Sequence, residues 1–384
     1  MTADRRLGVY VHFPYCTRRC PYCDFTVTVR PIEHERYAEA VVAELAVRAP
    51  AFADHDPALS VYFGGGTPGL WRPACVGAVV DAVAARLGVA AGAEITVECN
   101  PEDVVLDHLV GLRAAGVTRI SLGTQAFDDA RLRQLGRQHD AATNRRAAEA
   151  VHAAGFPELS LDLIYGVCDQ PTEAALADVA AAAALGPTHL SAYQLTIEAG
   201  TPFGARAARG EVLTGGEDAL AEVFEAVRSA AADAGYLPYE ISNFARPGHE
   251  AVHNSLYWTQ GDYLALGAGA HGFLKQSDGG GVRWENARPL ARYLQGALAG
   301  TPAEQSREVL DAATVLEERV FTGLRLEAGL PVDATLEARY GQAARRLHAR
   351  GLLVVTADRW RTTPQGRLLL NHVALTLLDD NGGA

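Results

Sequence analysis

Short apolar segments alternate with amphipathic ones along the first half of the chain. The apolar segments predict strands that begin near Leu7, Ser60, Glu94, Arg119, Leu159 and His189. Helical spacing of apolar residues predicts helices between them, over Glu35–Arg48, Pro73–Leu87, Asp103–Ala115, Asp140–Ala154 and Thr172–Leu185. Such alternation indicates a parallel sheet. Six units are fewer than the eight of the common closed barrel, so the count favours an open six-unit β/α barrel.

Unusual residues lie at or near the carboxyl ends of these predicted strands. A cluster of cysteines follows the first strand, and Asp162 lies within the fifth. The other strand ends carry Gly64–Pro68, Glu98–Pro101, Gly123–Gln125 and Tyr193–Gln194. In parallel β/α barrels the functional site is built at this edge. The pattern therefore predicts one site that draws residues from every strand.

The pattern changes beyond residue 205. A helix over Asp218–Gly235 is followed by the polar and aromatic segment Val252–Trp258 and the glycine-rich segment Leu266–Gly272. From about Glu304, two helices precede a β-hairpin, which predicts a small winged-helix-like domain. Histidine and aromatic residues beside a glycine-rich segment could ligate and stack on a tetrapyrrole. We expect a barrel over residues 1–205, an extension with these tetrapyrrole-binding motifs over 206–303, and the winged-helix-like domain over 304–384.

Composition narrows the class of protein. The chain has 384 residues, of which 48% are hydrophobic, and no apolar run is long enough to cross a bilayer. Its net charge of −12 weighs against a nucleic-acid partner. The start of the chain, Met1–Arg6, lacks the apolar region of a secretory signal, so we expect a cytoplasmic protein. The sequence does not predict an oligomeric state.

Three closely spaced cysteines are the most informative motif. Cys16, Cys20 and Cys23 form a C-x3-C-x2-C run. A disulfide or an incidental cluster is the alternative, but disulfides belong to oxidising compartments. A structural zinc ion and a cubane iron–sulfur cluster are each bound by four ligands. Three thiolates on a cubane would leave one iron open to an exchangeable ligand. The remaining cysteines, Cys75, Cys99 and Cys168, are expected to be ordinary buried thiols.

This run, with an aromatic residue before its third cysteine and a strand ahead of it, resembles the signature of the radical S-adenosylmethionine (SAM) superfamily. The resemblance implies a 4Fe-4S cluster whose open iron is chelated by SAM. It also implies a SAM site made by Tyr10, Tyr22, Gly65, Gly66, Thr67, Glu98, Gln125, Arg137 and Asp162. Each of these residues could instead have a purely structural role. The glycines could form a tight turn, the carboxylates could form ion pairs, and Arg137 could lie on the surface.

Within the superfamily, segments along nearly the whole chain resemble the group around oxygen-independent coproporphyrinogen III oxidase. The oxidases carry a further cysteine two residues after the third, where this chain has Phe25, and a longer N-terminal segment. Both departures match the HemW-type haem chaperones of the same group, as does the run H-N-x-x-Y-W at residues 253–258. That resemblance implies haem contacts from His253, Tyr257 and Trp258. Taken alone, His253 reads as a satisfied core residue, and His271 is a weaker candidate ligand.

Three hypotheses follow. The first is a cytoplasmic radical SAM haem chaperone that delivers haem to acceptor proteins, membrane-associated ones included, and that needs an electron donor. The second is an oxygen-independent coproporphyrinogen III oxidase acting on a porphyrinogen, which Phe25 disfavours. The third is a radical SAM enzyme acting on RNA, which the net acidity disfavours. No catalytic residue is assigned. The sequence leaves open SAM turnover, the haem axial ligand and the haem acceptor.

Overall fold

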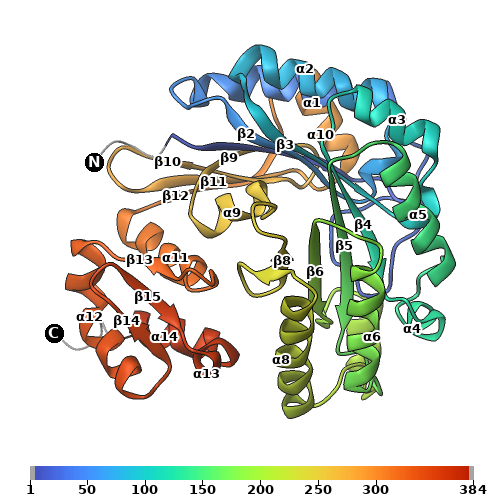
Figure 1. Ribbon diagram of the computed structural model, residues 1–384. Coiled ribbons are helices and arrows are strands. Elements are labelled where there is room, and N and C mark those ends of the chain that lie inside the picture. The colour runs from blue at the N-terminus through green and yellow to red at the C-terminus, as the bar shows by residue number, and fades with distance from the viewer. Residues whose placement is uncertain (1–4, 380–384) are drawn as a thin grey trace.

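A twelve-stranded sheet with helices on its outer face forms most of the molecule in the computed structural model, which describes residues 5–379 (Figure 1). Six parallel strands follow one another in chain order at its centre. They are β1 (Leu7–Phe13), β2 (Ala58–Gly65), β3 (Val89–Cys99), β4 (Arg119–Gln125), β5 (Glu158–Tyr165) and β6 (His189–Gln194). Each begins within a few residues of the predicted position; β3 begins earliest relative to prediction, at Val89.

The strands of the second half of the chain extend both edges of this sheet. Next to β6 lie β8 (Asn243–Ala245) and then β7 (Leu237–Pro238), both antiparallel. Next to β1 lies β9 (Asp262–Leu266), which is parallel to it, followed by antiparallel β10 (His271–Lys275), β11 (Gly281–Asn286) and β12 (Glu304–Leu310). Strands β7 and β12 are the two ends of the sheet and do not pair with each other. The expected open six-unit β/α barrel is therefore confirmed.

Helices cover the convex face of the curved sheet (Figure 1). Those between the parallel strands are α1 (His34–Arg48), α2 (Pro73–Leu87), α3 (Leu106–Ala114), α4 (Asp129–Gln134), α5 (Ala141–Ala153) and α6 (Thr172–Ala183). Of the later helices, α8 (Glu217–Asp233) packs on α6 and α10 (Leu290–Leu298) packs on α1. Helix α9 (Val252–Trp258) lies on the concave side instead, where His253 stacks on Tyr62, and α7 (Pro202–Ala207) follows β6. Helix α3 starts later than predicted because Pro101–Asp103 forms a short 3-10 turn and Val104 and Val105 are extended.

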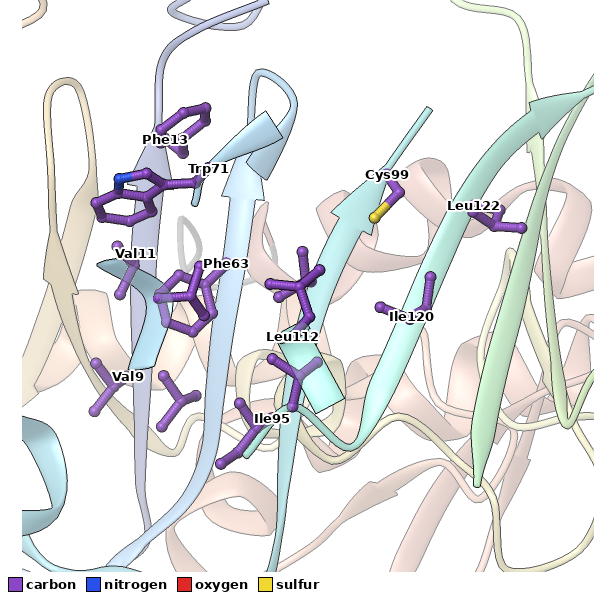
Figure 2. Close-up of a cluster of buried hydrophobic side chains, with 14 of the residues drawn as sticks. Val9, Val11, Phe13, Phe63, Trp71, Ile95, Cys99, Leu112, Ile120 and Leu122 are labelled. Atoms are coloured by element: carbon purple, nitrogen blue, oxygen red, sulfur yellow. The ribbon is translucent and has the colours of Figure 1, made fainter. Parts of the chain in front are cut away.

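The main hydrophobic core lies between the sheet and these helices. Figure 2 shows alternate residues of β1, among them Val9, Val11 and Phe13, pointing into it beside Phe63 and Trp71. This alternation follows from the two-residue period of a strand, which places every second side chain on one face. The opposite residues of the same strands face the concave side, where the polar residues gather. Cys75 and Cys99 are buried as expected, whereas Cys168, on the loop after β5, is half-buried.

A separate small core holds the C-terminal domain together. It comprises α11 (Ala312–Gly323), β13 (Leu330–Pro331), α12 (Ala334–Ala349), the hairpin of β14 (Leu353–Val355) and β15 (Arg359–Thr362), α13 (Pro364–Leu368) and α14 (Leu370–Asp379). The winged-helix-like arrangement agrees with expectation, and the two closing helices extend it. Residues Glu304–Leu310 pair with β11, so they belong to the large sheet rather than to this domain. Within residues 5–379, no helix is both long and apolar enough to span a membrane.

Candidate functional site

The three cysteines lie on one loop after β1 and line a common cavity. This cavity, of about 410 Å³, occupies the concave interior of the barrel and is called the barrel cavity below. Cys16 accepts a hydrogen bond from the Thr67 hydroxyl at 3.6 Å, and Cys20 accepts one from Arg137 at 3.3 Å. Burial raises the pKa of the Cys16 thiol to about 11. Metal binding at these thiols would therefore release protons.

The arrangement of the three cysteine side chains distinguishes a single metal ion from an iron–sulfur cluster. Within residues 5–379, no three metal-binding side chains converge tightly enough to hold a single ion. A cubane keeps its cysteine sulfurs farther apart than one ion does, because each sulfur binds a different iron. Three cysteines around one cavity, two of them with hydrogen-bond donors at sulfur, fit a cluster of that kind.

The glycine loop after β2 lies directly against the cysteine loop. The Gly66 N–H donates to the Phe13 carbonyl and the Thr67 N–H donates to the Tyr15 carbonyl, both at 2.8 Å. The Gly65 N–H donates to Glu98 at 3.1 Å. A side chain at Gly66 would collide with the Tyr15 carbonyl, 2.5 Å from an added Cβ. Since all three N–H groups are used internally, the loop can offer a ligand carbonyl oxygens, which suit an ammonium group.

The two predicted carboxylates face the barrel cavity, and each has protein partners. Glu98 accepts a 2.7 Å hydrogen bond from the Tyr62 hydroxyl, and Asp162 accepts from the Ser121 hydroxyl at 3.1 Å. Burial, with the Asp162 charge nearby, raises the pKa of Glu98 to about 7, against the hydrogen bond from Tyr62. Burial also raises the pKa of Asp162. Neither makes an ion pair within the described residues, so the alternative of a structural ion pair is not what the structure holds.

Arg137 is buried at the cavity wall, which rules out a surface position. One guanidinium nitrogen donates to Cys20, and the other donates to the Asn100 side chain at 2.6 Å. Its Nε atom has no partner within the described residues. The residue lines the barrel cavity, and a guanidinium is suited to a ligand carboxylate. The predicted Tyr22 and Gln125 line the same cavity, and Gln125 has a left-handed backbone with φ of 63°.

Sequence reasoning missed several residues of the barrel cavity. Asn100 joins two parts of the site, since it donates to Thr67 at 2.9 Å and accepts from Arg137. Its place in the run that ends the third strand was the available signal. The deep end of the cavity is lined by Arg119, His189 and Asn254. The first two are polar residues at the starts of strands, where a barrel site is not expected.

Tyr10 lies elsewhere than predicted. It lines a second cavity of about 370 Å³, together with Phe25, Tyr257, Tyr263, His271 and Arg288, among others. We call this the His271 cavity. Phe25 also lines the barrel cavity, so the two hollows are neighbours on the concave side of the sheet.

The H-N-x-x-Y-W residues on α9 point in different directions. Asn254 lines the barrel cavity, and Tyr257 lines the His271 cavity. His253 is 1% exposed, lines neither of them, and has both ring nitrogens hydrogen-bonded, to Ser60 and Tyr257. Trp258 lines neither cavity and packs beneath Arg325, 5.6 Å from its ring centre. Of the three predicted haem contacts, the structure thus brings only Tyr257 to one of these two cavities.

Comparison with known proteins places the chain in a family. Residues 10–182 match the model of the Radical SAM superfamily, and residues 310–369 match that of the HemN C-terminal domain. The haem chaperone HemW of Escherichia coli is 36% identical over 96% of this chain and 97% of its own length. HemW of Mycobacterium tuberculosis H37Rv is 37% identical over 97% and 94%.

A mitochondrial relative and a solved structure extend the comparison. The mouse mitochondrial radical S-adenosyl methionine domain-containing protein 1 is 34% identical over 98% of this chain and 88% of its own. The coproporphyrinogen III oxidase HemN of Escherichia coli superposes with a TM-score of 0.80 over 97% of this chain and 90% of that one, at 24% identity. That last likeness concerns the fold. The full-length identities show that the chain belongs to the HemW family of radical SAM proteins.

Proposed function

We propose that this protein is a radical SAM haem chaperone, which binds a 4Fe-4S cluster, SAM and haem and passes haem to acceptor proteins. The observation that carries the proposal is identity of 36% to the haem chaperone HemW over nearly the full length of both chains. The composition of the cysteine loop supports it, because Phe25 stands where the resemblance to the oxidases calls for a fourth cysteine.

In this proposal the cysteine loop holds the cluster. Cys16, Cys20 and Cys23 bind three irons, and the fourth is left for SAM. The hydrogen bond from Thr67 offsets part of the effect by which burial raises the pKa of Cys16. Arg137 donates to the sulfur of Cys20. The reduced cluster would supply the electron for cleaving SAM, an event that the proposal does not require for haem transfer.

The walls of the barrel cavity are proposed to bind SAM. Carbonyls of the Gly65–Gly66–Thr67 loop would accept from its ammonium group, and the Arg137 guanidinium would donate to its carboxylate. Glu98 and Asp162 would accept from the ribose hydroxyls, while Tyr22 and Gln125 complete the wall. The SAM role expected of Tyr10 from the resemblance would be indirect, through its ring contact with Tyr62, 6.2 Å between ring centres.

The proposed function requires an electron donor and a haem acceptor, and it places the protein in the cytoplasm. A reductant must reach the cluster, and an acceptor must take the haem; both are proteins outside this chain. All six cysteines are free thiols, in keeping with the proposed cytoplasmic location, where disulfides are rare. Net charge of −12 continues to argue against a nucleic-acid substrate.

Two assays on one preparation test the proposal. Anaerobically reconstituted protein is titrated with haem, and the same protein is incubated with coproporphyrinogen III, SAM and reductant. We expect one haem per chain and no protoporphyrinogen IX. Decarboxylation of coproporphyrinogen III would favour the oxidase instead, and failure to take up haem would refute the chaperone.

A further inference from the structure

The His271 cavity offers what a planar metal macrocycle requires, and no site has been assigned to it. We propose that haem binds there, with His271 as an axial ligand of the iron. This inference rests on the proposed function and deepens it, because it locates the haem and replaces His253 as the candidate ligand.

The two buried histidines near this cavity, His253 and His12, have both ring nitrogens hydrogen-bonded. His253 is bonded through Nδ1 to Ser60 and through Nε2 to the Tyr257 hydroxyl, each at 2.8 Å. His12, 5% exposed, is bonded through Nδ1 to the Tyr10 hydroxyl at 3.0 Å and through Nε2 to the Thr26 carbonyl at 2.8 Å. Neither ring has a nitrogen lone pair free for iron unless the core around it opens.

His271 differs from His253 and His12 both in its exposure and in its hydrogen bonding. Its side chain is 54% exposed, at the start of β10, and lines the cavity. Within residues 5–379 its ring makes no hydrogen bond, and the Glu285 carboxylate lies 3.8 Å from Nε2. In metal sites a carboxylate that accepts a hydrogen bond from one ring nitrogen orients the histidine and raises its basicity. Glu285 is the carboxylate beside this ring, and its Oε1 accepts from Arg288. The other nitrogen is then available to donate its lone pair to the iron.

The cavity walls supply apolar contact for a macrocycle. Tyr257 and Tyr263 form one wall with their rings nearly perpendicular, 4.7 Å between centres. Phe25 lines the same cavity and is 61% exposed. An exposed phenylalanine beside a cavity is poorly accounted for by the fold, and a bound aromatic surface would cover it.

The cavity lining holds one arginine, Arg288, that can pair with a haem propionate, and one carboxylate, Asp24. Arg288 lines the same cavity, and its side chain is 57% exposed. Its Nε donates to Glu285 at 2.5 Å, which leaves further guanidinium donors directed away from that carboxylate. One arginine at the mouth and one histidine beside it would fix both the carboxylate edge and the iron. An open mouth of this kind also allows release, which a chaperone requires.

Phe25 lies between the proposed haem site and the loop proposed to hold the iron–sulfur cluster. The same side chain lines the barrel cavity and the His271 cavity, so haem in the second would lie next to the cysteine loop. The residue that separates this chain from the oxidase pattern thus stands at the boundary between the two sites. A haem contact is a physical reason for an aromatic residue at that position.

Haem titration of full-length reconstituted variants tests the proposal. His271→Ala should lower the affinity for ferric haem at least about tenfold and shift the Soret band, and added imidazole should restore the band. Arg288→Ala should weaken binding roughly threefold, as loss of one exposed charge pair would, without moving the band. His152→Ala, an exposed histidine on the outer helix α5, is the matched control and should behave as wild type.

The outcomes separate this inference from the proposed function. If wild-type protein binds haem and His271→Ala binds it with the same affinity and spectrum, the His271 site is refuted while the chaperone stands. If wild-type protein binds no haem, the proposed function itself fails. Because His271 is exposed, its removal should leave the melting temperature and the iron content unchanged, and a change in either would be checked against His271→Gln.

Discussion

The Nε2 atom of His253 lies 2.8 Å from the hydroxyl oxygen of Tyr257, one turn further along α9. The imidazole is also stacked on Tyr62, 5.0 Å between ring centres, and Tyr62 donates to Glu98 in the barrel cavity. His253 therefore stands between the residues proposed for SAM and those proposed for haem. Its contacts are those of a residue that positions Tyr257, whose ring lines the His271 cavity.

This pairing predicts a stability effect. His253→Ala should lower the free energy of unfolding by about 2–4 kcal/mol, because it empties a core position and leaves the Tyr257 hydroxyl without its partner. Tyr257→Phe should cost about 1 kcal/mol, and the double variant should be less destabilised than the sum. Denaturant unfolding of the four proteins measures the coupling. Strict additivity would mean that the hydrogen bond contributes nothing.

Cluster binding should depend on the three loop cysteines and on no others. Wild-type protein reconstituted without oxygen should hold about four iron and four sulfide per chain. Replacing Cys16, Cys20 or Cys23 by Ala should abolish the cluster, since each supplies one iron ligand. Cys75→Ala and Cys168→Ala are the controls and should retain it. Iron and sulfide analysis of each variant measures the cluster content. Full iron content in the triple alanine variant would contradict the assignment of these cysteines as cluster ligands.

The raised pKa of Glu98 predicts pH-dependent SAM binding. The groups that face its carboxyl are Tyr62, Asp162, Tyr10 and the Gly65 N–H, and the pKa is about 7. Only the ionised form accepts hydrogen bonds at both oxygens, so affinity should rise with pH. Between about pH 6 and pH 7.5 the ionised fraction grows roughly eightfold, and affinity should follow.

The same carboxyl offers a control for that experiment. Glu98→Gln cannot ionise, so its SAM affinity should be weak and should lose this part of the pH dependence. Calorimetric titration with SAM at each pH, on cluster-loaded protein, measures both. An identical pH profile in wild type and Glu98→Gln would mean that another group is responsible.

Arg137 should be sensitive even to a conservative change. Its guanidinium donates to Cys20 and Asn100 at once while the residue lines the barrel cavity, an arrangement that a lysine ammonium cannot reproduce. Arg137→Lys should weaken SAM binding about tenfold, equivalent to 1.4 kcal/mol. Arg133→Lys, on the exposed side of α4, should have no effect. Equal SAM affinity in the two variants would assign Arg137 a structural role.

The sequence alone determined the barrel and the composition of its site. Strand starts at Leu7, Arg119 and His189 were predictable because apolar runs and helical spacing are local patterns. Parallel strands in chain order then bring their carboxyl ends to one edge, so the cysteines, the glycine loop and Glu98 had to meet. The place of Arg137 was implied only by the family resemblance. The haem-chaperone family was also within reach, from Phe25 and the motif on α9.

Tertiary structure decided which residues of those motifs are accessible. The pairing of β9 with β1, as in Leu7 with Asp262, joins segments from opposite halves of the chain. That pairing turns His253 toward Ser60 and Tyr62 in the core, and it leaves His271 exposed on the neighbouring strand β10. The sequence favoured His253 over His271 as a haem ligand, because His253 belongs to the H-N-x-x-Y-W run. Burial depends on contacts between distant segments, and no local pattern specifies it.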